Sequence, residues 1–218
     1  WEELEARLRA LPEAQLPLLI RALSEILIDP PVFDDYQPDP ALFDGWVAAQ
    51  PDNVLAKIAR GSLLTRHGWE IRGAGWTDSV SEKKWEGFHE ALNQGSPSLQ
   101  QALEAEPENI AALDAAILNC KGLENVDALK TLIDRLVASG STFYFAHDAA
   151  LDALAPKWHG SMDEILGYAR DRVADAPSGS PLFGLIAKAH TELWLYTEVV
   201  DQLDFDWLNE GEHRAELE

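Results

Sequence analysis

The chain has 218 residues, 46% of them hydrophobic, enough for one substantial core or two small coupled cores, which excludes extensive disorder. Asp and Glu number 38 against 17 Lys and Arg, so the formal net charge of -21 excludes nucleic acid and anionic membranes as partners and favours a basic one. The lone Cys120 excludes an internal disulfide and favours a reducing, cytoplasmic location. No apolar run approaches the ~20 residues that span a bilayer, so no membrane-spanning segment is expected.

Residues 1–40 are predicted to form an N-terminal helical hairpin and a proline-rich connector. Apolar residues at helical spacing predict a helix near its centre, which the acidic, proline-rich run 29–40 ends. The face of this helix expected to be buried consists of Leu16, Leu19, Leu23, Ile26 and Leu27.

Residues 41–200 are predicted to form an all-α, tetratricopeptide-like domain, in which antiparallel helical hairpins stack as a solenoid or superhelix. The turn at 50–53, Gln-Pro-Asp-Asn, recurs as Glu-Pro-Glu-Asn at 106–109, and an alanine-rich helix follows each copy. Asp114 and Asp148 open two similar apolar segments that are thirty-four residues apart, the tetratricopeptide period. Small residues in these segments let helices pack closely.

Helix boundaries later in the chain follow from capping residues. A helix over 125–137 is the expected partner of the one that begins near 110. Ser161 and Glu164 have capping-box spacing, which predicts a helix start at 161. A last helix over 181–196 closes the stack, and 201–218 is an acidic C-terminal tail.

Two further helix starts are predicted between 79 and 97. Ser79 and Glu82 repeat the capping-box spacing. Ser96 followed by Pro97 fits an N-cap with proline at the first helical position.

Four short motifs stand out between residues 59 and 161. They are 59–61 (Ala-Arg-Gly), 69–75 (Trp-Glu-Ile-Arg-Gly-Ala-Gly), Val80 with Trp85 and Phe88, and 156–161 (Pro-Lys-Trp-His-Gly-Ser). These motifs resemble those of a bacterial domain-of-unknown-function family, the one numbered 4034. The resemblance spans roughly 53–168, and it implies a tetratricopeptide-like helical fold and no established reaction or ligand. His159 departs from the pattern, because glycine is expected there.

No residue pattern predicts a catalytic centre, a metal site or a cofactor. The six histidines are never within five residues of each other, so a local zinc motif is missing. His147 with Asp148 is a candidate metal dyad, but helix packing with a solvated charge is the favoured interpretation. Cys120 is interpreted as an inert core thiol rather than a nucleophile. The sequence at 73–75, Gly-Ala-Gly, has no preceding strand or phosphate-loop lysine and is interpreted as a turn.

A basic, tryptophan-rich segment at 53–89 departs from the acidic background, because its six cations exceed its carboxylates by two. Arginines stacked on indole faces are hypothesised to form a groove for an acidic or aromatic peptide. In the alternative, which is favoured, the arginines pair with buried carboxylates or loop carbonyls and the tryptophans brace the loop. The hypothetical groove consists of Arg60, Trp69, Arg72, Trp76, Lys157 and Trp158.

These patterns predict a non-catalytic protein–protein interaction module. One alternative is an immunity protein that neutralises a basic, nuclease-type bacterial toxin, since acidic charge speeds the capture of a cationic target. Another is a hydrolase whose site is assembled from distant helices.

Overall fold

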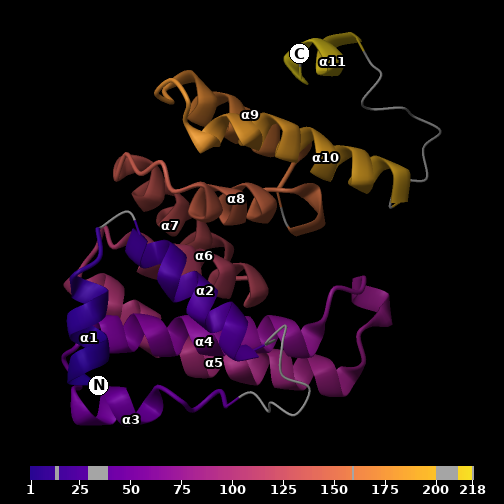
Figure 1. Ribbon diagram of the computed structural model, residues 1–218. Helices are drawn as coiled ribbons and strands as arrows, with labels where there is room; N and C mark the ends of the chain where they lie inside the picture. Colours follow the sequence, from indigo (N-terminus) through magenta and orange to yellow (C-terminus); the bar gives the residue numbers. More distant parts are fainter. Residues whose placement is uncertain (13–14, 29–38, 159, 200–210, 218) are drawn as a thin grey trace. The chain divides into compact units, whose positions relative to one another are not determined.

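The computed structural model describes residues 1–12, 15–28, 39–158, 160–199 and 211–217, most of which are helical (Figure 1). Every regular element in these ranges is an α-helix or a short 3₁₀ helix, which confirms the all-α prediction. Most of the connector predicted at 29–40, and positions 201–210 of the predicted tail, lie outside the described residues.

The chain divides into two compact units, Trp1–Ser139 and Gly140–Glu218. The segment 41–200, treated above as one domain, therefore extends across both units. The first unit contains α1 (Glu2–Arg9), α2 (Leu16–Ile28), α3 (Asp44–Ala49), α4 (Val54–Arg72), α5 (Glu82–Ala105), α6 (Ile110–Gly122) and α7 (Val126–Ala138). The second unit contains α8 (Tyr144–Ala153), α9 (Met162–Ala174), α10 (Gly184–Val199) and α11 (Gly211–Leu217).

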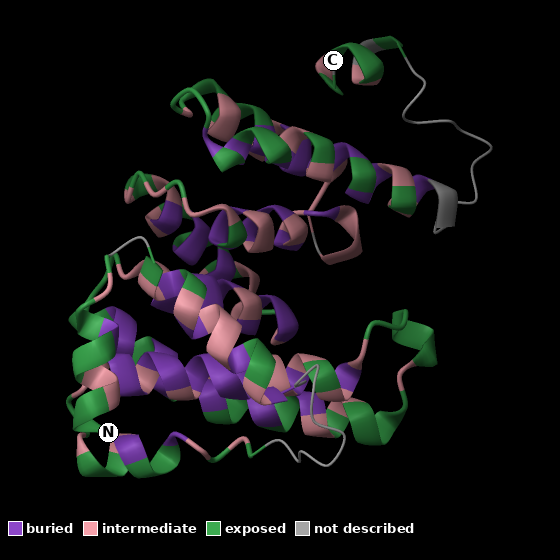
Figure 2. Ribbon diagram, viewed as in Figure 1, coloured by how far each residue is buried: buried purple, intermediate pink, exposed green. Residues whose placement is uncertain are grey.

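The long α4–α5 hairpin is the centre of the first unit. Gly61 and Gly95 allow the two helices to approach closely, since a Cβ on Gly61 would lie 2.5 Å from Leu99 Cγ and 3.2 Å from the Gly95 carbonyl oxygen. Helix α6 packs against both α4 and α5, α7 packs against α6, and α2 packs against α4 and α6. Buried side chains concentrate where these helices meet (Figure 2).

The two similar turns predicted from sequence have the same structure. Asn53 caps α4 by accepting a hydrogen bond from the Ala56 amide at 3.3 Å, and Asn109 caps α6 through the Ala112 amide at 3.2 Å. Each Asn side chain also donates, at 2.7 Å, to the residue three positions earlier, Gln50 in the first copy. Each cap satisfies an amide left without a partner in the first helical turn.

The predicted apolar face of α2 is confirmed only in part. Leu16, Leu19, Leu23 and Leu27 are partly buried, but Ile26 is 53% exposed, and the most buried residues include Ile20, Ser24 and Ile28. Ser24 is buried because its hydroxyl group donates to the Ile20 carbonyl at 2.9 Å and lies 3.1 Å from Ser62 Oγ on α4. A polar group satisfied in this way is buried at little cost.

A partly buried ion cluster also joins α2 to α4 and α6. Asp114, which is 4% exposed, lies 3.5 Å from Arg21 and 3.7 Å from Arg66, and Arg66 lies 3.0 Å from Glu25. Burial lowers the pKa of Arg66, and Asp114 opposes that shift. Arginine nevertheless remains protonated, so the cluster holds paired charges between three helices.

The two helix starts predicted at Ser79 and Ser96 are wrong. Helix α5 begins at Glu82 after Ser81, and the Ser79 hydroxyl donates to the Trp76 carbonyl at 2.7 Å. The helix continues through Pro97. Proline there removes one backbone hydrogen bond, but packing of α5 against α4 keeps the helix in place.

The helices predicted at 125–137 and from 161 are confirmed. Ser161 caps α9 through the Glu164 amide at 3.1 Å and donates to the Glu164 carboxylate at 2.9 Å. The helix expected at 181–196 is a 3₁₀ turn, Pro181–Phe183, followed by α10. Helices α8, α9 and α10 enclose the core of the second unit, and α11 packs on α10.

Candidate functional site

Arg72, at the end of α4, is buried between two indole rings. Its Cζ atom lies 5.6 Å from the centroid of the Trp69 ring and 5.2 Å from that of Trp85. Its Nη1 donates to the carbonyls of Gly73 at 3.0 Å and Gly75 at 3.2 Å. Burial lowers the pKa of Arg72. The guanidinium group therefore fastens the loop that follows α4 to the aromatic side chains below it.

The loop backbone between α4 and α5 is restricted as well. Gly73 has φ 75° and ψ 178°, a region that only glycine occupies readily. A Cβ on Gly75 would lie 2.4 Å from Ser79 Oγ. The Ser79 amide and hydroxyl both donate to the Trp76 carbonyl, at 2.8 and 2.7 Å. The loop therefore has a defined conformation, and it leaves Trp76 46% exposed.

Trp69 ties the α4–α5 hairpin to α6. Its Nε1 donates to the Leu118 carbonyl at 3.2 Å, and its ring meets Phe88 edge to face with centroids 4.9 Å apart. Lys121 Nζ lies 4.4 Å from the Trp69 ring centroid. These contacts bury most of the aromatic surface around Arg72 inside the unit.

Arg60 lies three turns before Arg72 on α4 and joins three helices. It forms an ion pair with Asp44 at 2.6 Å and donates to the Gln94 carbonyl at 2.9 Å and the Ser98 hydroxyl at 3.0 Å. These contacts connect α4 to α3 and α5.

Lys157 and Trp158 belong to the second unit, in the 3₁₀ turn Pro156–Trp158. Lys157 forms ion pairs with Asp152, at 2.9 Å, and with Glu192. Burial opposes its charge, but these carboxylates outweigh burial and raise the pKa of Lys157. The structure thus brings Trp69, Arg72 and Trp76 together at one loop and places the other predicted residues elsewhere on α4 or in the other unit. The peptide groove predicted from these residues stays a prediction.

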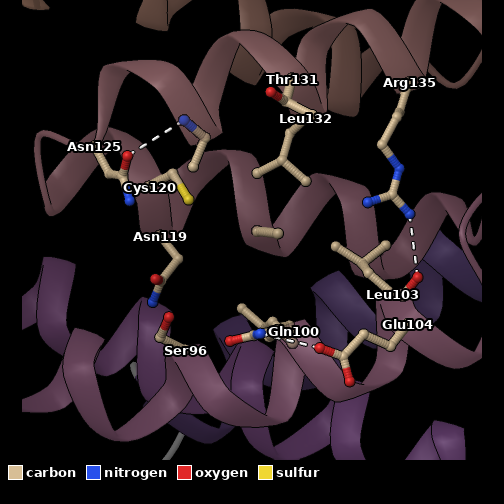
Figure 3. A pocket seen from close by; sticks show the side chains of 13 residues that line it. Ser96, Gln100, Leu103, Glu104, Asn119, Cys120, Asn125, Thr131, Leu132 and Arg135 are labelled. Atoms are coloured by element: carbon tan, nitrogen blue, oxygen red, sulfur yellow. Dashed lines mark hydrogen bonds between the residues drawn. The ribbon is translucent and has the colours of Figure 1, made fainter.

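A different groove lies between α5 and α7, with α6 as its floor (Figure 3). Its volume is about 330 Å³, at the lower end of the range for ligand sites. The apolar part of its lining includes Leu99, Leu103, Ala116 and Leu132, and the polar part includes Gln100, Glu104, Asn119, Asn125, Thr131 and Arg135.

The polar side chains of the groove are held in place by hydrogen bonds to the helices. Arg135 donates to the carbonyls of Leu103, at 3.2 Å, and Pro107, and its other terminal nitrogen turns toward the groove (Figure 3). Asn119 donates to Thr65 Oγ1 and to the Leu92 carbonyl, both at 3.0 Å. The groove is therefore a shaped, mixed apolar and polar surface.

Cys120 also lines the groove, and its thiol is neutral at physiological pH, because burial raises the pKa of Cys120 to about 11. One sequence pattern points to this site. Asn119 and Cys120 lie three and four residues after Ala116 on α6, so the three form a stripe of small and polar side chains on one side of this mostly buried helix. That α5 and α7 flank this stripe is a consequence of tertiary packing alone.

The described residues contain no group of three or more His, Cys, Asp or Glu side chains arranged to hold a metal ion. His147, the candidate metal ligand, is 1% exposed, with Nδ1 2.7 Å from the Tyr168 hydroxyl and Nε2 2.8 Å from the Ser141 carbonyl oxygen. Burial lowers the pKa of His147. Both ring nitrogens are thus engaged in the packing of the second unit. Of the helices described, none has the length and apolar character needed to cross a bilayer.

The chain matches no protein-family profile, no curated protein and no solved structure. The resemblance to the family numbered 4034 therefore stays a prediction, and the function is argued from the geometry.

Proposed function

We propose that the chain is a non-catalytic protein–protein interaction module with a tetratricopeptide-like arrangement of helical hairpins. Two features support this arrangement in the first unit. The α4–α5 and α6–α7 hairpins follow each other, and the same asparagine-capped turn precedes each of them. Helix α6 packs on both helices of the preceding hairpin, as the first helix of a stacked repeat must.

The groove between α5 and α7 carries this proposal. Successive hairpins that pack through α6 leave an open channel between their second helices, and apolar side chains form part of its lining. Leu99, Leu103 and Leu132 supply a surface for an apolar side chain of the partner. Gln100 Nε2 already donates to Glu104, and Asn125 Oδ1 already accepts from the Ala128 amide (Figure 3). The Gln100 side-chain oxygen and the Asn125 Nδ2 group can bind the backbone of a peptide.

We expect the binding surface of the partner to be basic, except for the residues that enter the groove. The net charge of -21 attracts cations at long range, and Glu104, at the groove, and Glu106 and Glu108, in the turn that follows α5, are exposed carboxylates. We place this interaction in the cytoplasm, where the lone Cys120 stays reduced.

The test uses a substitution that fills the groove and leaves the buried core unchanged. Ala128 lines the groove on α7 and is partly exposed, whereas Ala138, at the end of the same helix, is exposed and outside it. Partners are captured in cells with a photo-crosslinking amino acid at Gln100 and identified, and their binding to purified variants is measured by calorimetry. We expect Ala128→Phe to weaken binding at least tenfold and Ala138→Phe to leave it unchanged. Equal affinity for Ala128→Phe and the unsubstituted chain, with the helical circular dichroism intact, would refute a groove-bound partner.

The high acidic charge also supports a second candidate function, an immunity protein for a basic toxin. Association would then slow steeply with salt, because electrostatic steering is screened over about 10 Å at 0.1 M ionic strength. Co-expression with toxins encoded beside the gene tests this candidate. If none of these toxins is neutralised, or if association is insensitive to salt, this candidate is excluded.

A further inference from the structure

We propose that Trp76 is an anchor residue that inserts into an apolar pocket on a partner protein, with carboxylates at the pocket rim facing Lys83 and Lys84. The inference rests on the proposed function only in that the chain binds protein, and it concerns a surface of the first unit other than the groove. It differs from the peptide groove predicted from sequence, because Arg72, Trp69 and Trp85 act inside the unit and Trp76 alone is presented outward.

The exposure of Trp76 is the first observation. Its side chain belongs to a loop in which residues 74–79 are all exposed, and its ring stacks on none of the aromatic side chains that the structure describes. A large indole surface left in water is unfavourable for folding. Tryptophan is also the residue type most enriched among side chains that dominate binding energies.

The second observation is that two independent features hold the loop that carries Trp76 in a defined conformation. Arg72 fixes the carbonyls of Gly73 and Gly75 from below. The backbone conformation of Gly73 favours glycine, and a Cβ at Gly75 would displace the Ser79 hydroxyl group from its hydrogen bond to the Trp76 carbonyl. The result is that Trp76 projects from a loop already ordered before binding, so that little conformational entropy is lost when its ring enters a pocket.

The charge beside the loop defines the partner. Lys83 and Lys84 are exposed in the first turn of α5, and Lys84 Nζ would lie 3.6 Å from a Cβ at Gly73. Residues 72–84 contain three cationic side chains and two carboxylates, Asp78 and Glu82, so the net charge of this segment is positive. The net charge of the whole chain, in contrast, is negative. Exposed charges act over about one screening length, roughly 8–10 Å, so these lysines favour carboxylates near Trp76. The indole N–H further requires an acceptor in the pocket.

The experiment uses the full chain, with Trp76 kept in place, and a photo-crosslinking amino acid, p-benzoylphenylalanine, at the adjacent exposed position Thr77. The control carries it at Leu18, which is 48% exposed on α2. Adducts formed in cells are identified by mass spectrometry. The identified protein is then purified and titrated against the unsubstituted chain, Trp76→Ala, Lys84→Glu and Leu18→Ala. Circular dichroism and size-exclusion chromatography show that each variant is folded.

We expect a partner adduct at position 77 and none with the same protein at position 18. Trp76→Ala should raise the Kd roughly 30-fold or more, as for a central anchor, Lys84→Glu should raise it about 3- to 10-fold, and Leu18→Ala should leave it unchanged. The proposal is overturned if position 77 yields no adduct, if its adduct is a second copy of this chain, or if Trp76→Ala binds with unaltered affinity. If Ala128→Phe loses binding and Trp76→Ala binds fully, the anchor proposal is overturned and the groove proposal is retained. If Trp76→Ala loses binding and Ala128→Phe binds fully, the groove proposal is overturned and the anchor proposal is retained.

Discussion

The close contact of α4 and α5 at Gly61 predicts that Gly61→Ala destabilises the first unit. In a helix interior without tertiary contacts, alanine is favoured over glycine by about 1 kcal/mol. At position 61, however, the new Cβ would lie 2.5 Å from Leu99 Cγ and 2.7 Å from Leu99 Cδ2, more than an ångström inside the usual carbon–carbon separation. Overpacking of this kind costs about 1–3 kcal/mol. We therefore expect a net loss of about 1 kcal/mol in the free energy of unfolding.

Gly167→Ala in α9 is the matched control, because a Cβ there meets nothing within 4 Å. It should stabilise the second unit by about 0.5–1 kcal/mol. Guanidinium denaturation followed by far-UV circular dichroism, with hydrogen exchange to assign each effect to its unit, measures both changes. If Gly61→Ala is as stabilising as Gly167→Ala, the close approach of α4 and α5 at Gly61 is refuted.

Two titratable groups give further predictions. The rate of Cys120 alkylation by iodoacetamide should keep rising from pH 9 through pH 11, where half of the thiol is ionised, because burial raises the pKa of this thiol to about 11; a plateau by pH 9 would contradict the burial of Cys120. Hydrogen bonding to Arg170 and, secondarily, to His190 lowers the pKa of Glu216 to about 2. The folded-state pKa thus lies below the ordinary value of 4.5, so the stabilisation from Glu216 is complete above pH 4.5 and is lost as the pH falls toward 2. Glu216→Gln should remove this part of the acid sensitivity of α11, measured by hydrogen exchange, and an unchanged pH profile would refute the contact.

The capped turns illustrate what could be predicted from the sequence. Asn53, Asn109 and Ser161 each bind an amide three residues ahead, so the interaction is local and its spacing is visible in the sequence. The same rule failed at Ser79 and Ser96. Ser79 binds the Trp76 carbonyl within the loop instead, and packing on α4 carries α5 through Pro97.

The candidate site residues, like the helix starts, could be predicted from the sequence only in part. The basic and aromatic composition of 53–89 was enough to single out the segment, but not to separate Arg72, whose guanidinium group is buried, from Trp76, which is exposed. The groove between α5 and α7 was not predicted, because its walls are more than twenty residues apart in the chain. Packing of both helices on α6, and the hydrogen bond from Arg135 of α7 to the Leu103 carbonyl of α5, bring them together.

The sequence by itself determined that the chain is helical and determined the start of several helices, because helical periodicity and capping depend on residues within one or two turns of each other. Tertiary structure decided which residues of α2 are most buried, that α5 continues through Pro97, and that Trp76 is left exposed to water. These outcomes depend on contacts between residues far apart in the sequence, whose free energies exceed the local preferences that the sequence displays.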